Sequence, residues 1–202
     1  MERTVIKLPE PIFDSKVAVE AALWARKSIR SYQGEDLTLA EVSQLLWAAQ
    51  GINRKNGMRT APSAGALYPL EVYLVVGQIE QLPVGVYKYR FQGHELIQIS
   101  DEEKRQALAA AGYGQSCIER ASINIVIAAV YERTAGKYGE RAVRYVHMEV
   151  GHAAQNIYLQ AITLELGTVV VGAFDDSRVK KILMMDADES PLNIMPVGRA
   201  RK

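Results

Sequence analysis

Apolar positions recur at helical spacing in the first quarter of the chain. Residues 16–28 present one apolar face, and residues 39–50 present a second one, so both segments are predicted to be helices. Thr38 and Glu41 stand in the arrangement of a capping box, in which each side chain satisfies the other's backbone N–H. Gly51 follows the last apolar position and is expected to end the second helix.

The longest helical pattern covers residues 140–166, and Gly167 is expected to end it. Its apolar positions are numerous enough to predict burial over much of the helix surface. In a chain of this size, such a helix is expected to lie at the centre of the molecule or in a dimer interface. Ser100 and Glu103 form a second candidate capping box, which predicts a helix reaching about Ala111.

Runs of β-branched and aromatic residues predict the strands. These runs occupy residues 71–77, 84–90, 94–100, 123–131, 167–174 and 191–199. Gln92 and Gly93 join the second and third runs as a hairpin, and the uninterrupted apolar run 123–131 is typical of a central buried strand. Asp176 is placed to cap a short helix that reaches Leu183. The pattern predicts an α+β fold, with an antiparallel or mixed sheet flanked by helices.

Composition narrows the classes of protein that fit this pattern. The 202 residues suit a single domain, 1–202, with an extended, proline-marked lead-in at 1–14. The net charge of +1 gives no global attraction to nucleic acid or to an anionic membrane. Cys117 is the only cysteine, which excludes an intrachain disulfide. The chain begins without a signal-peptide pattern, and no apolar run approaches the roughly 20 residues that span a bilayer, so we expect a cytoplasmic location.

Four segments carry candidate chemistry. Arg26, Lys27 and Arg30 surround Ser28, and this arrangement is either a solvated helix end or a phosphate site, since arginine matches phosphate oxygens two at a time. Residues 62–69 combine small side chains with adjacent backbone N–H groups.

The segment 62–69 is either a tight loop or a binding site for a flat ligand. Gly172 and Ala173 follow a predicted strand, where a backbone N–H could meet a heterocycle, or where Asp175 or Asp176 could cap a helix. Gly198 and Arg199 open a basic C-terminal end, which is either a disordered tail or a second phosphate contact.

In this order, the four segments resemble the FMN-dependent nitroreductase family, from about residue 20 to residue 201. The resemblance implies a nitroreductase-like fold and an FMN cofactor. The implied FMN contacts are Arg26, Lys27, Ser28, Arg30, Pro62, Ser63, Ala64, Ala66, Gly172, Ala173, Gly198 and Arg199. Many family members carry asparagine where this chain has Ala66, so one side-chain contact to the flavin is missing from the pattern.

Two further motifs resemble the SagB-type dehydrogenases, which oxidise peptide azolines to azoles. These motifs are PSAGALYPLEVYLV (62–75) and GKYGER (136–141), the latter followed by GHAAQN (151–156). The resemblance implies that Lys137 and Tyr138 are catalytic, because azoline oxidation removes a proton as well as a hydride and a lysine can take the proton. An exposed loop before the long helix is the alternative interpretation of this pair.

The resemblance implies an enzyme that acts as a homodimer, with FMN at the subunit interface and a small-molecule or peptide substrate. A second possibility is an NAD(P)H-dependent nitro or quinone reductase. A third is a non-catalytic FMN-binding protein, for which Ala66 leaves room. No metal site is expected, because His94, His147 and His152 lack ligand spacing. Acidic residues interrupt the basic and aromatic stretch 131–145, which argues against a nucleic-acid surface.

Overall fold

A single antiparallel sheet forms the middle of the molecule. The computed structural model describes residues 4–77 and 79–201, so residues 1–3 of the predicted lead-in and Lys202 lie outside the described residues. The sheet has eight strands in the order β1-β5-β4-β3-β6-β8-β2, and β7 pairs with β8. The strands are β1 (Val5–Lys7), β2 (Tyr32–Gln33), β3 (Leu70–Val76), β4 (Gly85–Arg90), β5 (Glu95–Ser100), β6 (Ile123–Val130), β7 (Leu166–Thr168) and β8 (Glu189–Ala200). The α+β fold with a mostly antiparallel sheet is therefore confirmed.

Strand β6 lies between β3 and β8, and all eight of its residues are buried. Ile125 and Ile127 face one helical layer, whereas Val126 and Ala128 face the other. This burial on both faces explains the uninterrupted apolar run in the sequence, because a strand covered on one face alone would alternate apolar and polar residues.

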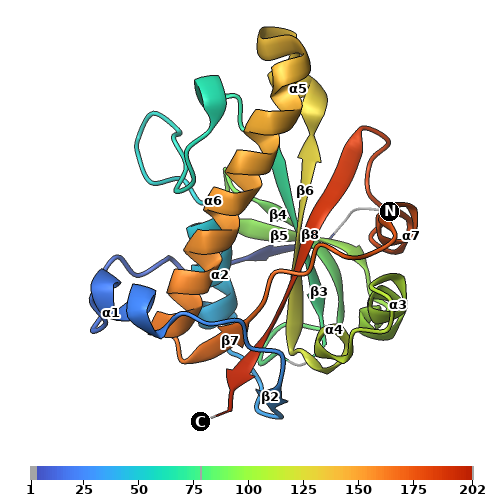
Figure 1. The fold of residues 1–202 in the computed structure, drawn as a ribbon. Helices are drawn as coiled ribbons and strands as arrows, with labels where there is room; N and C mark the ends of the chain where they lie inside the picture. The colour runs from blue at the N-terminus through green and yellow to red at the C-terminus, as the bar shows by residue number, and fades with distance from the viewer. Residues whose placement is uncertain (1–3, 78, 202) are drawn as a thin grey trace.

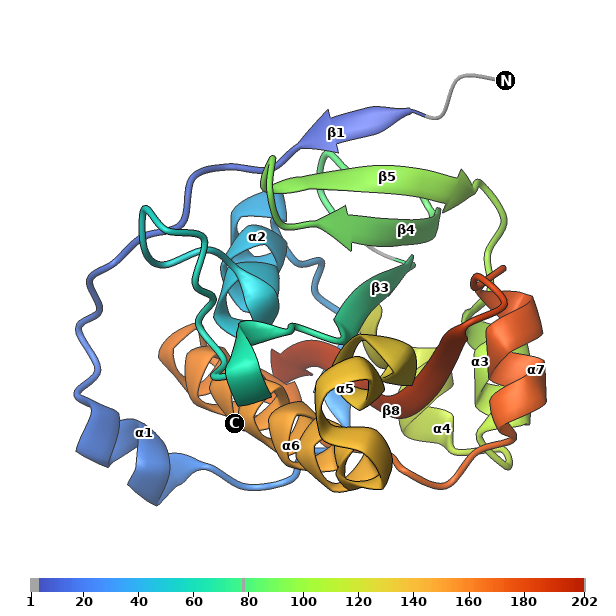
Figure 2. The ribbon, with the colours of Figure 1, turned by 90° about the horizontal axis from the view of Figure 1, so that it is seen from above.

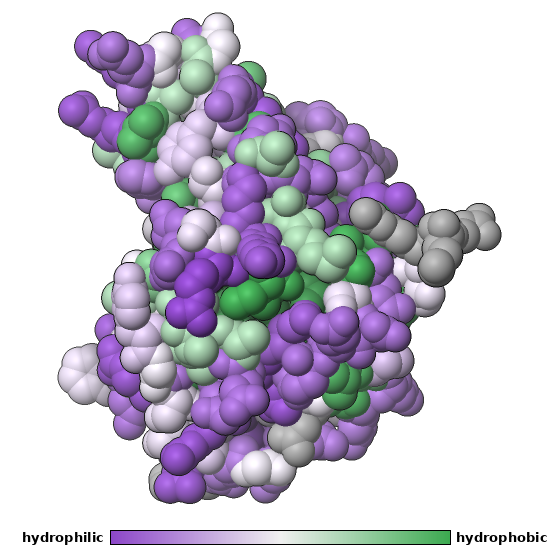
Figure 3. Space-filling view, turned by 90° about the vertical axis from the view of Figure 1, so that its right-hand side faces the viewer, coloured by the Kyte–Doolittle hydropathy of each residue, from purple (hydrophilic) through white to green (hydrophobic). Residues whose placement is uncertain are grey.

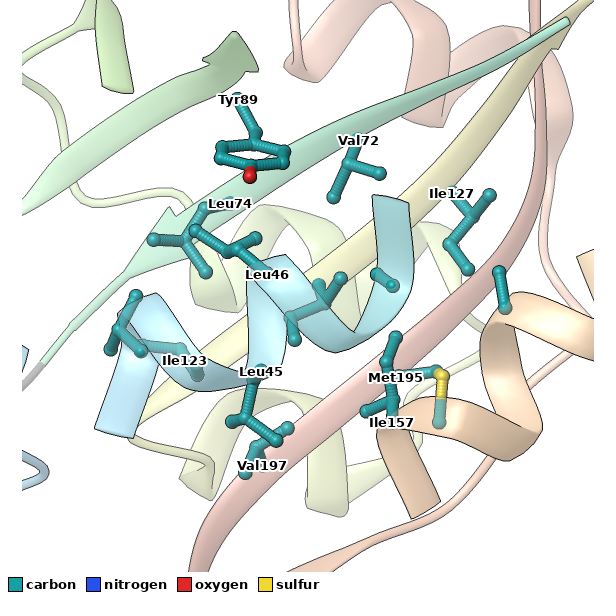
Figure 4. Close-up of a cluster of buried hydrophobic side chains, with 14 of the residues drawn as sticks. Leu45, Leu46, Val72, Leu74, Tyr89, Ile123, Ile127, Ile157, Met195 and Val197 are labelled. Atoms are coloured by element: carbon teal, nitrogen blue, oxygen red, sulfur yellow. The ribbon is translucent and has the colours of Figure 1, made fainter. Parts of the chain in front are cut away.

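Helices cover both faces of the sheet (Figures 1 and 2). They are α1 (Val19–Ala25), α2 (Leu39–Gln50), α3 (Arg105–Ala111), α4 (Ser116–Arg120), α5 (Tyr131–Tyr138), α6 (Ala142–Thr163) and α7 (Asp176–Ile182), with 3₁₀ turns η1 (Ala64–Ala66) and η2 (Gly139–Arg141). Helices α2 and α6 pack on one face, and α3, α4 and α7 pack on the other. Figure 4 shows the larger core, where Leu45 and Leu46 of α2 meet Ile157 of α6 and side chains of the sheet.

The capping box at Thr38 and Glu41 is confirmed, and it opens α2. The predicted helix 16–28 is too long, because α1 ends at Ala25 and the following residues leave the helix. Ile29 N–H instead donates to the carbonyl of Thr168 at 2.9 Å. A tertiary backbone bond thus replaces the helical one, and the cationic segment 26–30 is not part of a helix.

The second predicted capping box is wrong. Helix α3 begins only at Arg105, and its N-cap Lys104 makes no side-chain capping bond. Ser100 belongs to β5, and its hydroxyl accepts from Glu102 N–H at 3.2 Å. The Glu103 carboxylate binds the Arg105 guanidinium at 2.7 Å and is therefore held by a local ion pair.

The end of the long helix and the strand after it also differ from the prediction. Helix α6 ends at Thr163, and Leu166–Thr168 already forms β7. The predicted strand 167–174 is reduced to the end of β7 and an isolated bridge from Val171 to Ile194. Asp175, rather than Asp176, caps α7 by accepting from Arg178 N–H. The pair Lys137 and Tyr138 ends helix α5, so the predicted alternative of a loop is wrong, although Lys137 is exposed as that alternative expected.

The two helical sides differ in surface character. Exposed large apolar side chains gather along the N-terminal arm and α1, where Phe13 and Leu23 are exposed and Trp24 is 92% exposed. The side that carries α3 and α7 is largely hydrophilic, with a smaller apolar area near its middle (Figure 3). No helix in the described part of the chain is long and apolar enough to cross a membrane.

Candidate active site

Helix α6 connects two clusters, each of which contains some of the predicted site residues. The Tyr158 cluster consists of Arg26, Ser28, Tyr158 and Val170, and the Glu149 cluster consists of Ser63, Gly65, Lys137, Tyr138 and Glu149. Glu149 and Tyr158 are nine positions apart, which corresponds to a rise of about 14 Å along the helix. The two clusters therefore lie at separate positions along one rigid element.

In the Tyr158 cluster, one tyrosine joins three segments that are far apart in the sequence. The Arg26 guanidinium carbon lies 5.2 Å from the centroid of the Tyr158 ring. The Tyr158 hydroxyl lies 3.2 Å from the Ser28 hydroxyl and accepts the Val170 N–H at 2.9 Å. Tyr158 thus ties the segment after α1 to the segment that leads to Gly172.

The turn at Gly172 and Ala173 leaves its backbone accessible. Both residues are exposed, and a Cβ added at Gly172 would meet no atom within 4 Å. Gln115 holds the turn from the other side, because its amide donates to the Ala173 carbonyl at 3.1 Å. Lys27 and Arg30, on the segment that Tyr158 ties to the chain before this turn, are exposed as well.

In the Glu149 cluster, residues 62–68 form a compact loop over α6. The Ser63 hydroxyl accepts the Tyr68 N–H at 2.8 Å, which closes the loop. Gly65, Ala66 and Tyr68 all have positive φ angles, of 63°, 55° and 48°. Because left-handed backbone conformations need small or locally bonded residues, the Gly-Ala sequence suits this geometry. Pro62, Gly65 and Ala66 are exposed, while Ala64 is half-buried.

Lys137 and Tyr138 lie against this loop. A Cβ added at Gly65 would come within 2.9 Å of the Tyr138 hydroxyl and 3.1 Å of Lys137 Nζ. The Tyr138 ring packs edge-on against Tyr145 of α6, with ring centroids 5.0 Å apart. The structure therefore brings the two predicted catalytic residues together with the Pro62–Ala66 segment, although they are about 70 positions apart in the chain.

A buried carboxyl group lies next to the loop. Glu149 is 2% exposed. Burial raises the pKa of Glu149 to about 7, against the opposing effects of a hydrogen bond from Ser63 and the charge of Arg59. Arg59 is itself 8% exposed, and burial lowers the pKa of its guanidinium to about 10. Its guanidinium stacks on Tyr68 and donates to the Gln50 side chain at 2.8 Å.

Gly198 and Arg199 occupy neither cluster. The Arg199 guanidinium donates to Glu41 at 2.7 Å and also approaches Glu35 at 3.7 Å. Gly198 packs against the Tyr32 ring, which a Cβ would approach to 2.6 Å. Arg199 and Lys27 line one hollow of about 430 Å³. The structure thus gives both residues roles within the sheet, and their predicted contact with phosphate stays a prediction.

A larger cavity lies elsewhere. It has a volume of about 670 Å³ and separates the N-terminal arm from α2 and α6. The Gln44 side chain anchors the arm by donating to the Ile12 carbonyl and accepting from Ile12 N–H, and Phe13 stacks near Trp47. The residues of the two clusters do not line this cavity. Among the described residues, no group of histidine, cysteine and acidic side chains is arranged to hold a metal ion.

Sequence reasoning missed Tyr158, Glu149 and Arg59 as site residues. A signal was available for Glu149, since Val146 and Ala153 at helical spacing are apolar and place it on the buried face of α6. Tyr158 and Arg59 offered no comparable signal, because their partners come from distant segments of the chain.

Comparison with known proteins gives a consistent result. The nitroreductase family model matches residues 23–199. The chain is 48% identical over 194 residues to the nitroreductase-type protein MJ1384 of Methanocaldococcus jannaschii, covering 96% of each chain. It is 28% identical over 134 residues to the microcin B17-processing protein McbC of Escherichia coli, covering 63% of this chain and 49% of McbC.

Among solved structures, a nitroreductase-type protein of Ralstonia eutropha superposes with a TM-score of 0.86 at 30% identity, covering 98% of this chain and 90% of that one. The family match spans both clusters and most of the sheet. The chain belongs to the nitroreductase family, whose members are oxidoreductases that typically bind a flavin.

Proposed function

We propose that this protein is an FMN-dependent dehydrogenase that oxidises azoline-type or related small substrates by hydride transfer to the flavin. The observation that carries the proposal is the contact of Lys137 and Tyr138 with Gly65 in the loop 62–68. A hydride acceptor and a proton acceptor at one place are the two requirements of such an oxidation.

The residues present fit an FMN. Arg26, Lys27, Ser28 and Arg30 offer cations and a hydroxyl for a phosphate, and Tyr158 holds the first of them in place. The exposed small residues of the loop 62–66 and the exposed Gly172-Ala173 turn leave room for a flat ring close to backbone N–H groups. Gly198 and Arg199 belong to the proposed set as a further contact near Lys27.

The chain's own residues then divide the work. The flavin supplies the acceptor for the hydride that leaves the substrate carbon. Lys137 accepts the proton from the neighbouring ring carbon as the carbon–carbon double bond of the azole forms, and the Tyr138 hydroxyl orients the substrate and shares that proton. The α5 helix fixes both side chains at one end of the loop, which supplies the orientation on which the reaction depends.

We propose further that the active protein is a homodimer. Ile12, Phe13, Val19, Leu23 and Trp24 expose apolar side chains beside α6. Apolar residues gathered in this way on one side are typical of a surface that another chain covers. Each site would then use residues of both subunits, as the family resemblance implies. Analytical ultracentrifugation tests this part, and a monomer with bound FMN would contradict it.

The second candidate function is an NAD(P)H-dependent reductase of nitro compounds or quinones. The specific support is the similarity to the M. jannaschii and R. eutropha proteins, which are nitroreductase-type. The similarity to McbC supports the dehydrogenase, because that protein processes microcin B17.

One experiment separates these functions. The absorbance spectrum of the purified, FMN-loaded protein is recorded anaerobically before and after addition of NADH, NADPH or an azoline peptide. Bleaching by the azoline peptide, with azole formed, supports the dehydrogenase, whereas bleaching by a nicotinamide alone supports the reductase. A bound flavin that none of these bleaches indicates a non-catalytic FMN-binding protein.

A further inference from the structure

Glu149 is a buried ionisable group that the proposed reaction does not use. It lies on α6, is 2% exposed, and its Oε1 has no hydrogen-bond partner among the described residues. A buried carboxyl with an unpartnered oxygen costs stability, so its presence beside the site calls for a physical explanation.

The carboxyl lies beside the loop, because α6 packs against η1 and the Ser63 side chain acts on Glu149. The Ser63 hydroxyl accepts the Tyr68 N–H at 2.8 Å, which leaves the hydroxyl's own proton free for Glu149. Ser63 precedes η1, and η1 contains Gly65, against which Lys137 and Tyr138 pack. Glu149 thus supports the segment that the proposed function assigns to the flavin ring.

Few charges compensate the carboxyl when it is ionised. Arg59 is the cation that acts on it, but this guanidinium donates to the Gln50 side chain and the Leu70 carbonyl. From β3, Glu71 forms an ion pair with Arg133 at 2.6 Å and also interacts electrostatically with Arg59.

From α5, Lys137 and Tyr138 approach the loop at Gly65. The charged residues Arg26 and Arg199, on α1's C-cap and on β8, are bound to Tyr158 and Glu41 near the other end of α6. The negative charge of Glu149 would therefore act on whatever lies on the loop.

We propose that Glu149 is a positioning residue whose protonation state controls the redox behaviour of the flavin bound on the loop 62–68. This inference rests on the proposed FMN site. The protonated carboxyl supports the loop through Ser63 without adding charge. The ionised carboxylate places a buried negative charge under the loop and opposes the reduced, electron-rich flavin. The flavin is therefore harder to reduce above the pKa of Glu149 than below it.

The test is the midpoint potential of bound FMN, measured for the wild type and for Glu149→Gln. The pH range runs from about 5.5 to about 8.5, so that it extends to both sides of the Glu149 pKa. Gln keeps the shape and can accept the Ser63 proton, but it cannot ionise. We expect an extra break near neutral pH in the wild-type profile and no such break in the variant. Glu140→Gln, at an exposed position of η2, is the matched control and keeps the break.

Ser63→Ala provides a second readout, which a purely structural role of Glu149 would not change. Because the hydrogen bond from Ser63 lowers the pKa of Glu149, its removal moves the break to higher pH. A break that persists unchanged in Glu149→Gln overturns the inference while FMN binding still supports the proposed site. Failure of the wild type to bind FMN overturns both, so the two failures are distinguishable.

Discussion

The two clusters along α6 are built on opposite principles. In the Tyr158 cluster, the cation Arg26 remains near the surface, and the Tyr158 ring and the Ser28 hydroxyl hold its segment. In the Glu149 cluster, Glu149 is buried and its pKa is raised, and the neighbouring Arg59 is buried with a lowered pKa. A surface cation attracts an anion at little cost to folding, whereas a buried carboxyl opposes folding when it is charged.

This difference indicates a division of tasks. Exposed cations suit the binding of a phosphate that arrives from solvent, because they need no reorganisation. Buried ionisable groups suit the control of charge at a reacting ring, because their effect is weakly screened. Substitutions in the Tyr158 cluster should then change affinity for FMN, and those in the Glu149 cluster should change reactivity or its dependence on pH.

The largest expected effect is that of Lys137→Ala. Loss of the proton acceptor should lower the rate of azoline oxidation by about 100- to 10,000-fold, which is the usual contribution of a general base. FMN should remain bound, since the phosphate contacts lie in the other cluster. The rate is measured with an azoline peptide at saturating FMN, with the flavin content read from absorbance.

Arg26→Ala is the matched comparison for that variant, because it removes a cation from the other cluster. It should weaken FMN binding and leave turnover at saturating FMN close to that of the wild type. Retained oxidation in Lys137→Ala with full flavin would show that Lys137 is not the base.

The sheet and most of its strands could be predicted from the sequence, because period-two and continuous apolar runs report burial directly. The capping box at Thr38 was also predictable, because all of its atoms lie within four residues. The box at Ser100 failed because strand pairing of β5 competes with helix initiation there. A local sequence pattern cannot show whether strand pairing or helix initiation is the more stable at such a position.

The partners of site residues were harder to predict than the site segments themselves. Motifs located the loop 62–69 and the pair Lys137 and Tyr138, but not their contact. That contact depends on how α5 folds back from β6 onto α6, and the helix at residues 131–138 was not predicted. The role of Tyr158 likewise depends on three segments that meet only in the folded chain.

The next effect concerns stability in the Glu149 cluster. The pKa of Glu149 is raised from 4.5 to about 7 in the folded protein. The folded state therefore holds this proton more tightly than the unfolded state, and the associated stability is present below pH 4.5 and lost as the pH rises through 7. The difference in free energy of unfolding between Glu149→Gln and the wild type should therefore rise by about 3 kcal/mol, in favour of the variant, from low pH to high pH.

Urea unfolding at several pH values measures this difference. Glu140→Gln, at an exposed position, should follow the wild-type profile throughout. Parallel profiles for the wild type and Glu149→Gln would mean that the carboxyl does not titrate between the two pH limits.

A smaller effect is expected for Gly65→Ala. Alanine at a φ of 63° costs about 1 kcal/mol, and its Cβ would come within 2.9 Å of the Tyr138 hydroxyl. The Tyr138 and Lys137 side chains can move aside, so the fold should persist while azoline oxidation falls. Gly136→Ala is the control, because its Cβ meets no atom within 4 Å and it lies inside α5. Equal loss of activity in both variants would show that the contact of Gly65 with Lys137 and Tyr138 is not what catalysis requires.

The smallest effect is expected for Tyr158→Phe. The ring remains beside Arg26, but the hydroxyl that joins Ser28 to Val170 N–H is lost. Because Val170 is exposed, water can replace part of this interaction, and the net loss should be about 1 kcal/mol, or roughly fivefold in FMN affinity. Isothermal titration with FMN measures the affinity, and turnover at saturating FMN should be unchanged.

Tyr145→Phe is the control for this variant. Tyr145 lies on α6 near the Glu149 cluster, where its ring packs against Tyr138 of α5. Its affinity for FMN should equal that of the wild type. A Tyr158→Phe variant that binds FMN normally but turns over slowly would reverse the assignment of tasks to the two clusters. The cationic segment would then act on the reaction itself, and the burial of Glu149 would need an explanation unrelated to the flavin.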